Sequence, residues 1–179
     1  KYFIMFTIYK PHKNNLYNKL VELSRNIFFY EKIHLKDNFE TRVNLIFIHM
    51  SIILIIFKIK KKGDFPQDSF DNIFLNIEYH IREEGYGDVA VNKKMKLLLQ
   101  IFYDILLKIN YSKEGGIRIN KSLISKYLKP EIKESEGLIE YLIEYYENFY
   151  YFCFELENNS MLKGQINFKH LYNYGRTKT

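Results

Sequence analysis

The chain has 179 residues, one cysteine and a formal net charge of +6 at pH 7. A chain of this length is expected to form one domain, which can bury a core without disulfides or metals. The charge suits an anionic partner such as RNA, DNA or acidic lipid headgroups, although lysines spread along the chain also fit a solvated surface. The lone thiol, Cys153, lies among aromatic residues with no base beside it. This setting predicts a buried cysteine and not a nucleophile.

The first predicted helix begins near Asn14. Residues 1–12 are apolar but short, and they lack the features of an export signal or a transit peptide, so neither is expected. From Asn14 to about Tyr30 the apolar side chains recur at helical spacing and form one stripe, at Leu16, Leu20, Leu23 and Ile27.

The most apolar stretch follows, from 43 to 57, and a pattern like a capping box precedes it, with Asp37 three residues before Glu40. The stretch is shorter than the about 20 apolar residues that span a bilayer, and it contains Asn44 and His49. It therefore predicts a central buried helix. A lysine cluster ends it and is expected to face a membrane or the ribosome: Lys58, Lys60, Lys61 and Lys62.

Two further helices are predicted on either side of a glycine-containing loop. A turn from Gly63 to Pro66, with Asp64 as a cap and Pro66 in the first turn, begins a helix that ends at Gly85, and the next helix runs from about Asn92 to Ile109. Between them, Gly85 and Gly87 supply freely turning positions and Asp88 caps backbone donors or pairs with a cation. Val89 and Val91 are expected on an extended segment that pins the loop to the core.

The rest of the chain predicts a short helix over 120–128, ended by Pro130, and a long helix over 135–156. The fold class is therefore all-α, a compact bundle of about six helices in one domain, 1–179. Its core spans about 14–110, a helical extension about 117–163, and a polar, loosely ordered tail 164–179.

Reactive chemistry is not predicted by these residues. Gly85-x-Gly87 with nearby lysines suggests a phosphate loop, but the third glycine and the preceding strand are missing, and Asp88 opposes an anion. The histidines show no metal-ligand spacing, and the paired carboxylates look solvated. We therefore expect no cofactor, no metal and no catalytic residue. His49 is expected to be buried and satisfied by a carboxylate such as Asp88 or Glu83.

Two motifs resemble a known family. Residues 81–96 read Ile-Arg-Glu-Glu-Gly-Tyr-Gly-Asp-Val-Ala-Val-Asn-Lys-Lys-Met-Lys, and upstream stands Asp37-x4-Arg42-x6-His49. They resemble the ubiquinol-cytochrome c chaperone family, whose members carry an Asp...Arg-Phe...Leu-His helix and a Leu-Arg-Glu-x-Gly-Val-Gly-Asp-x-x-Val-x-Lys-x-Met-Lys loop. The chain departs from this pattern at Val43 and Tyr86, and no Gly-Arg follows Phe102-Tyr103. The resemblance assigns the family signature to Arg42, His49, Arg82, Glu83, Gly85, Gly87, Asp88, Val91 and Lys94.

The resemblance implies an assembly factor and not an enzyme. Family members help newly made cytochrome b to mature and to enter ubiquinol-cytochrome c reductase (the bc1 complex), and mitochondrial members act with a small partner protein near the ribosome exit tunnel. The partners it implies are cytochrome b, a small assembly factor and the ribosome, with peripheral contact at the inner membrane and no small-molecule substrate. The implied location is the bacterial cytoplasm or, in a eukaryote, the matrix side of that membrane. We expect Arg42, His49, Arg82 and Asp88 to form one polar cluster that fixes the loop.

Two other classes of protein remain open from the sequence. A basic helical module that binds RNA or the ribosome, or a membrane-peripheral adaptor, would explain the charge and would place the lysine cluster on one face with Lys93, Lys94 and Lys96. An enzyme would require a deep cleft at Arg42, His49 and Asp88.

Overall fold

The computed structural model describes residues 15–112, 115–130 and 136–169, and helices dominate this part of the chain. The all-α prediction is confirmed, although a two-stranded antiparallel hairpin that was not predicted pairs Asn110 with Arg118. The helices are α1 (Asn15–Ser24), α2 (Phe39–Lys60), α3 (Gln67–Glu83), α4 (Asp88–Lys108), α5 (Lys121–Tyr127), α6 (Glu136–Glu155) and α7 (Asn158–Leu162). A π-helical turn spans Phe28–Lys32, and the strands are β1 (Asn110–Tyr111) and β2 (Ile117–Arg118).

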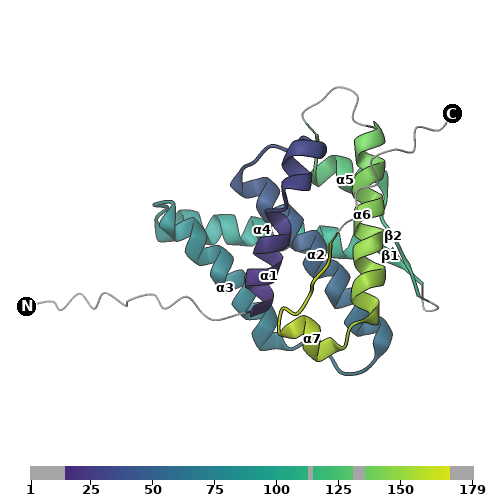
Figure 1. The fold of residues 1–179 in the computed structure, drawn as a ribbon. Coiled ribbons are helices and arrows are strands. Elements are labelled where there is room, and N and C mark those ends of the chain that lie inside the picture. The colour runs from purple at the N-terminus through teal and green to yellow at the C-terminus, as the bar shows by residue number, and fades with distance from the viewer. Residues whose placement is uncertain (1–14, 113–114, 131–135, 170–179) are drawn as a thin grey trace, which may run out of the picture.

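Helix α2 is the centre of the fold. It crosses the middle of the molecule between α1, α4 and α6, and all three pack against it (Figure 1). Every residue from Val43 to Ile53 is buried. Among the described residues α2 is the helix long and apolar enough to cross a membrane, yet 78% of its most apolar stretch is buried within the protein. This burial agrees with the prediction of a central core helix.

The start of α2 differs from the predicted capping box. Asn38 is the N-cap, and its side-chain oxygen accepts a hydrogen bond from the Thr41 backbone N–H at 2.8 Å. Asp37 lies one residue too early to reach that donor and pairs with Arg42 instead. The capping-box prediction with Asp37 and Glu40 is therefore wrong by one residue.

The first helix is shorter than predicted, because it ends at Ser24 and not near Tyr30. Just beyond it, the Asn26 side chain accepts a hydrogen bond from the Phe28 backbone N–H at 3.0 Å, an alternative to a helical bond. The chain then turns through the π-helical segment, which buries Phe28 and Phe29 and leaves Ile27 63% exposed.

The loop between α3 and α4 corrects two details of the prediction, and the start of α3 corrects a third. Gly85 does adopt a left-handed conformation, with φ +89°, but Gly87 has φ −73° and is the N-cap of α4. The predicted extended segment is already helix, so Val91 is buried whereas Val89, two residues earlier on a different side, is 86% exposed. At the start of α3, Pro66 and not Asp64 occupies the N-cap position.

The C-terminal helices α5 and α6 agree with their predicted ranges, but the segment after α7 does not behave as a loose polar tail. Ile166 is buried, and the Phe168 ring packs against those of Tyr145, Phe149 and Phe152. Gly164, with φ +68°, lies directly against the backbone of Asn15. The remainder of the predicted tail, 170–179, lies outside the described residues.

Candidate functional site

His49 lies at the middle of α2 and is fully buried. Its Nδ1 lies 2.7 Å from the Leu45 carbonyl oxygen and its Nε2 lies 3.0 Å from the Tyr145 hydroxyl. A carbonyl only accepts, so Nδ1 carries the proton and donates, and Nε2 accepts from Tyr145. The prediction of a carboxylate partner for His49 is therefore wrong. Glu83 at the end of α3 and Asp88 at the start of α4 are both exposed.

Aromatic rings enclose the imidazole. The ring centroids of Phe149, Tyr146, Tyr145 and Phe29 lie 4.8, 5.1, 5.6 and 6.1 Å from that of His49. Desolvation in this setting lowers the pKa of His49 from its usual value to about 4, so the ring is neutral at physiological pH. The geometry makes His49 a hydrogen-bonded part of the core that joins α2 to α6.

Arg42 lies at the exposed beginning of the same helix. Its Nε and Nη2 donate to the two carboxylate oxygens of Asp37 at 2.7 and 2.8 Å, a bidentate pair that lowers the pKa of Asp37. Arg42 also lines a small pocket of about 160 Å³ between α1, α2 and α3, together with Arg25, His80 and Glu84. The signature residues Arg42 and His49 thus face different surroundings.

Arg82 ties the end of α3 to the beginning of α4. It donates to Glu78 from Nε and Nη2 at 2.9 and 2.8 Å, and to Asp88 from Nη1 at 2.5 Å. The predicted role of Asp88 as partner of a cation is therefore present in the structure. Beside this bridge, the Lys94 ammonium lies 3.7 Å from the centroid of the Tyr86 ring.

The predicted four-residue polar cluster is wrong. His49 lies two turns beyond Arg42 and reaches the buried middle of α2, whereas Arg82 lies at the end of α3 and Asp88 at the exposed start of α4. Among the other signature positions, Val91 is buried, and Glu83, Gly85 and Gly87 are exposed. The loop pattern itself aligns its lysine with Lys93, so the assignment of Lys94 is off by one residue.

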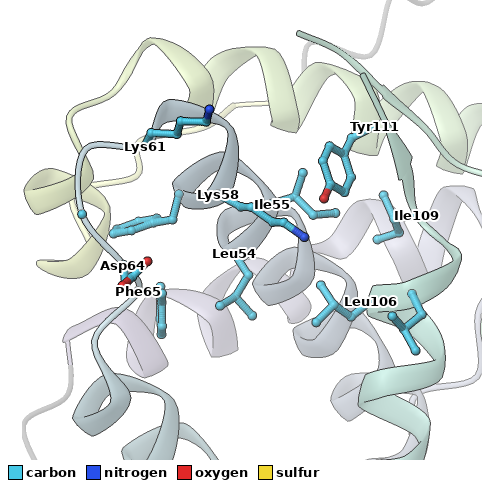
Figure 2. Close-up of a pocket in the computed structure, with 12 residues that line it drawn as sticks. Leu54, Ile55, Lys58, Lys61, Asp64, Phe65, Leu106, Ile109 and Tyr111 are labelled. Atoms are coloured by element: carbon cyan, nitrogen blue, oxygen red, sulfur yellow. The ribbon is translucent and has the colours of Figure 1, made fainter. Parts of the chain in front are cut away.

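The four lysines of the cluster at the end of α2 differ in burial and contacts. Lys60 donates to the Leu156 carbonyl at 2.5 Å and is partly buried, whereas Lys58, Lys61 and Lys62 are exposed. Lys58 and Lys61 border a groove of about 700 Å³ between the C-terminal ends of α2 and α4, shown in Figure 2. Its walls are mainly apolar, formed by Leu54, Ile55, Phe57, Phe65, Leu106, Leu107, Ile109 and Tyr111.

Besides this groove, two further surface features were not predicted from the sequence. Asp104 accepts from Lys108, Lys126 and the Tyr127 hydroxyl at 2.8, 2.9 and 2.5 Å, which joins α4 to α5 and lowers the pKa of Asp104. Asp104 occupies the position that follows Phe102-Tyr103, where the family pattern has the glycine of Gly-Arg. This departure from the pattern is the sequence feature that could have pointed to the site. The second feature, here termed the α4 outer face, consists of the exposed side chains Val89, Leu97 and Tyr103.

These features define a basic, all-α bundle with a histidine enclosed in its core and apolar and lysine-bearing surfaces outside. The family model described as ubiquinol-cytochrome C chaperone matches residues 31–165. The chain belongs to this family, whose members are assembly chaperones with a client in ubiquinol-cytochrome c reductase.

A solved structure supports the fold. The crystal structure of the Cbp3 homolog from Brucella abortus matches with a TM-score of 0.58 and 20% sequence identity, over 87% of each chain. At this identity the likeness concerns the fold alone. No curated protein matches the chain.

Proposed function

We propose that this protein binds newly made cytochrome b and supports its entry into the bc1 complex, acting from the side of the membrane where cytochrome b is synthesised. The observation that carries the proposal is the family match over residues 31–165, which includes both signature motifs. Its partners are cytochrome b, a small assembly factor and the ribosome, with peripheral contact at the inner membrane.

The α4 outer face is the proposed contact with cytochrome b. Val89, Leu97 and Tyr103 are 86%, 55% and 48% exposed, and their spacing places them on one side of a long helix. The three positions are spread over about 21 Å of the helix with the exposed Lys93 and Lys96 between them, so this side of α4 presents a mixed apolar and basic surface. A newly made membrane protein offers matching apolar segments, so this face is suited to hold one.

The signature loop, residues 81–96, has a structural role in this proposal. Arg82 bridges Glu78 and Asp88 across the turn, and Gly85 allows the turn itself. Together they set the direction in which α4 leaves the loop, and thus the orientation of the α4 outer face.

Binding without a catalytic step is also proposed. His49 is enclosed and neutral, and burial raises the pKa of the Cys153 thiol well above its usual range. Neither group is placed to meet a substrate.

The RNA-binding alternative fits the arrangement of lysines less well. It requires the lysine cluster and Lys93, Lys94 and Lys96 on one face. Lys58 and Lys61 instead border the groove beside Leu106, whereas Lys93 and Lys96 lie roughly 15 to 20 Å away along α4.

The proposal is tested by deleting the gene in its own host and measuring the cytochrome b haem signal and assembled bc1 complex. Both should fall and return with the wild-type gene, whereas Leu97→Asp should restore less, because a charge on the face opposes burial of apolar client. Exposed Ser125 on α5 offers the control Ser125→Asp, which adds the same charge elsewhere and should restore fully. Normal bc1 levels in the deletion strain would contradict the proposal.

A further inference from the structure

We propose that the groove between the C-terminal ends of α2 and α4 docks the protein on a bilayer that contains anionic phospholipid. An acyl chain of one lipid enters the groove, while Lys58 and Lys61 bind the phosphate of the same lipid's headgroup. This inference specifies the surface and the lipid for the peripheral membrane contact named in the proposed function, and it rests on that part of the proposed function.

The groove offers an apolar surface that no other described residue of the chain covers. Its volume of about 700 Å³ is within the range of small-ligand sites, roughly 300–1,000 Å³. Leu107 on its wall is 81% exposed and Tyr111 is 38% exposed, so both are available to a ligand or a membrane. Tyrosine is typical of membrane interfaces, where the ring lies among apolar groups and the hydroxyl reaches water.

The charge beside this apolar surface is positive. Among the lining residues Lys58 and Lys61 are basic and Asp64 alone is acidic. Figure 2 shows the Lys58 side chain extending between Ile55 and Leu106, whereas Asp64 lies next to Phe65. The Lys58 ammonium lies 5.5 Å from the centroid of the Tyr111 ring, which holds the charge over the groove and away from Asp64.

An anionic lipid satisfies both parts of the surface at once. Lysine carries a compact, strongly hydrated charge on a long apolar stem, so the stem can lie along the apolar wall while the ammonium meets the lipid phosphate. Clusters of basic residues next to exposed apolar side chains are a pattern of proteins that lie on acidic membranes. The exposed Lys62 adds to the same end of α2.

The test is co-sedimentation of the purified full chain with vesicles of phosphatidylcholine alone, or with a third of it replaced by phosphatidylglycerol. The wild type should bind the acidic vesicles and leave the neutral ones largely unbound. The double variant Lys58→Gln/Lys61→Gln keeps both apolar stems and should weaken binding about 30-fold, since each surface lysine contributes about a fivefold factor. The control Lys93→Gln/Lys96→Gln removes the same charge from exposed positions on α4 and should weaken it only a few-fold.

A second pair tests the apolar part. Leu107→Asp puts a charge on the groove wall and should reduce binding at least tenfold, whereas Ile27→Asp makes the same change at an exposed apolar position just after α1. Ile27→Asp should have only the small effect of its charge. Far-UV circular dichroism of all four variants should match the wild type, because the changed side chains are exposed.

The inference is overturned if acidic and neutral vesicles bind equally or not at all, or if the members of either pair behave alike. It is also overturned if Lys58→Gln/Lys61→Gln leaves vesicle binding intact and instead weakens binding to ribosomes or to an acidic peptide. A chain that fails on vesicles while its gene is still required for bc1 assembly would refute the membrane groove and leave the chaperone proposal standing.

Discussion

His49 illustrates how far a single residue is predicted by its neighbours in sequence. A histidine inside a long apolar stretch is expected to be buried, and it is. Its partner was not predictable, because Tyr145 lies 96 positions away on α6 and no local spacing relates the two. The exposed loop carboxylates were the wrong choice, since α2 directs His49 toward α6.

The burial of His49 predicts a stability that depends on pH. The unfolded chain takes up a proton near pH 6.5, whereas the folded protein does so only near pH 4, so stability falls as pH falls through this window. Between pH 7 and pH 5 the loss from His49 alone should be about 2 kcal/mol. Urea unfolding at the two pH values measures it.

The matched variant for this measurement is His49→Asn, which keeps an amide donor for the Leu45 carbonyl and does not titrate. It should be less stable than wild type at pH 7 but should lose about 2 kcal/mol less on going to pH 5. Equal losses in the two proteins would mean that the histidine is not held neutral in the folded state.

At the scale of elements, apolar spacing predicted the existence of the long helices, and their ends were decided by side-chain hydrogen bonds. Asn26 and Asn38 both accept from a backbone N–H two or three residues ahead, and each shifts a boundary. The glycines of the signature loop show the same limit. Two glycines in one loop look alike in sequence, yet only one of them needs to be glycine.

The same substitution at both glycines should therefore have opposite results. Gly85→Ser forces a side chain into a left-handed conformation and should cost about 1 kcal/mol. Gly87→Ser places a good cap at an extended N-cap and should be neutral or stabilising by a few tenths of a kcal/mol. Thermal or urea unfolding distinguishes them, and similar losses at both positions would contradict the assigned roles.

Gly164 should be more sensitive to substitution than a glycine that only turns. A Cβ there would clash with the Asn15 backbone carbonyl, whereas Gly63, also at positive φ, has open space around it. Gly63→Ala should cost about 1 kcal/mol for its conformation, and Gly164→Ala clearly more, because α1 or the C-terminal segment must move. Equal unfolding free energies for the two variants would show that this close approach is not needed.

For the whole molecule, the sequence predicted the all-α class and the family, because both depend on patterns many residues long. It did not predict how the signature residues separate: one in the core, one at the start of α2, and a pair on the exposed loop. That separation depends on which side of α2 faces α6. The groove likewise combines residues from distant elements, and the exposure of the α4 outer face depends on which side of α4 packs against the rest of the bundle. Both therefore appear only when the helices are packed.

The chain is proposed to hold cytochrome b during assembly of the bc1 complex. The most direct measurement is affinity capture of the tagged protein from its own cells after crosslinking, with mass spectrometry of the crosslinked peptides. Cytochrome b should be among the captured proteins, with crosslinks concentrated near the α4 outer face and reduced in Leu97→Asp. Capture of ribosomal RNA and proteins without cytochrome b or any other bc1 subunit would contradict it.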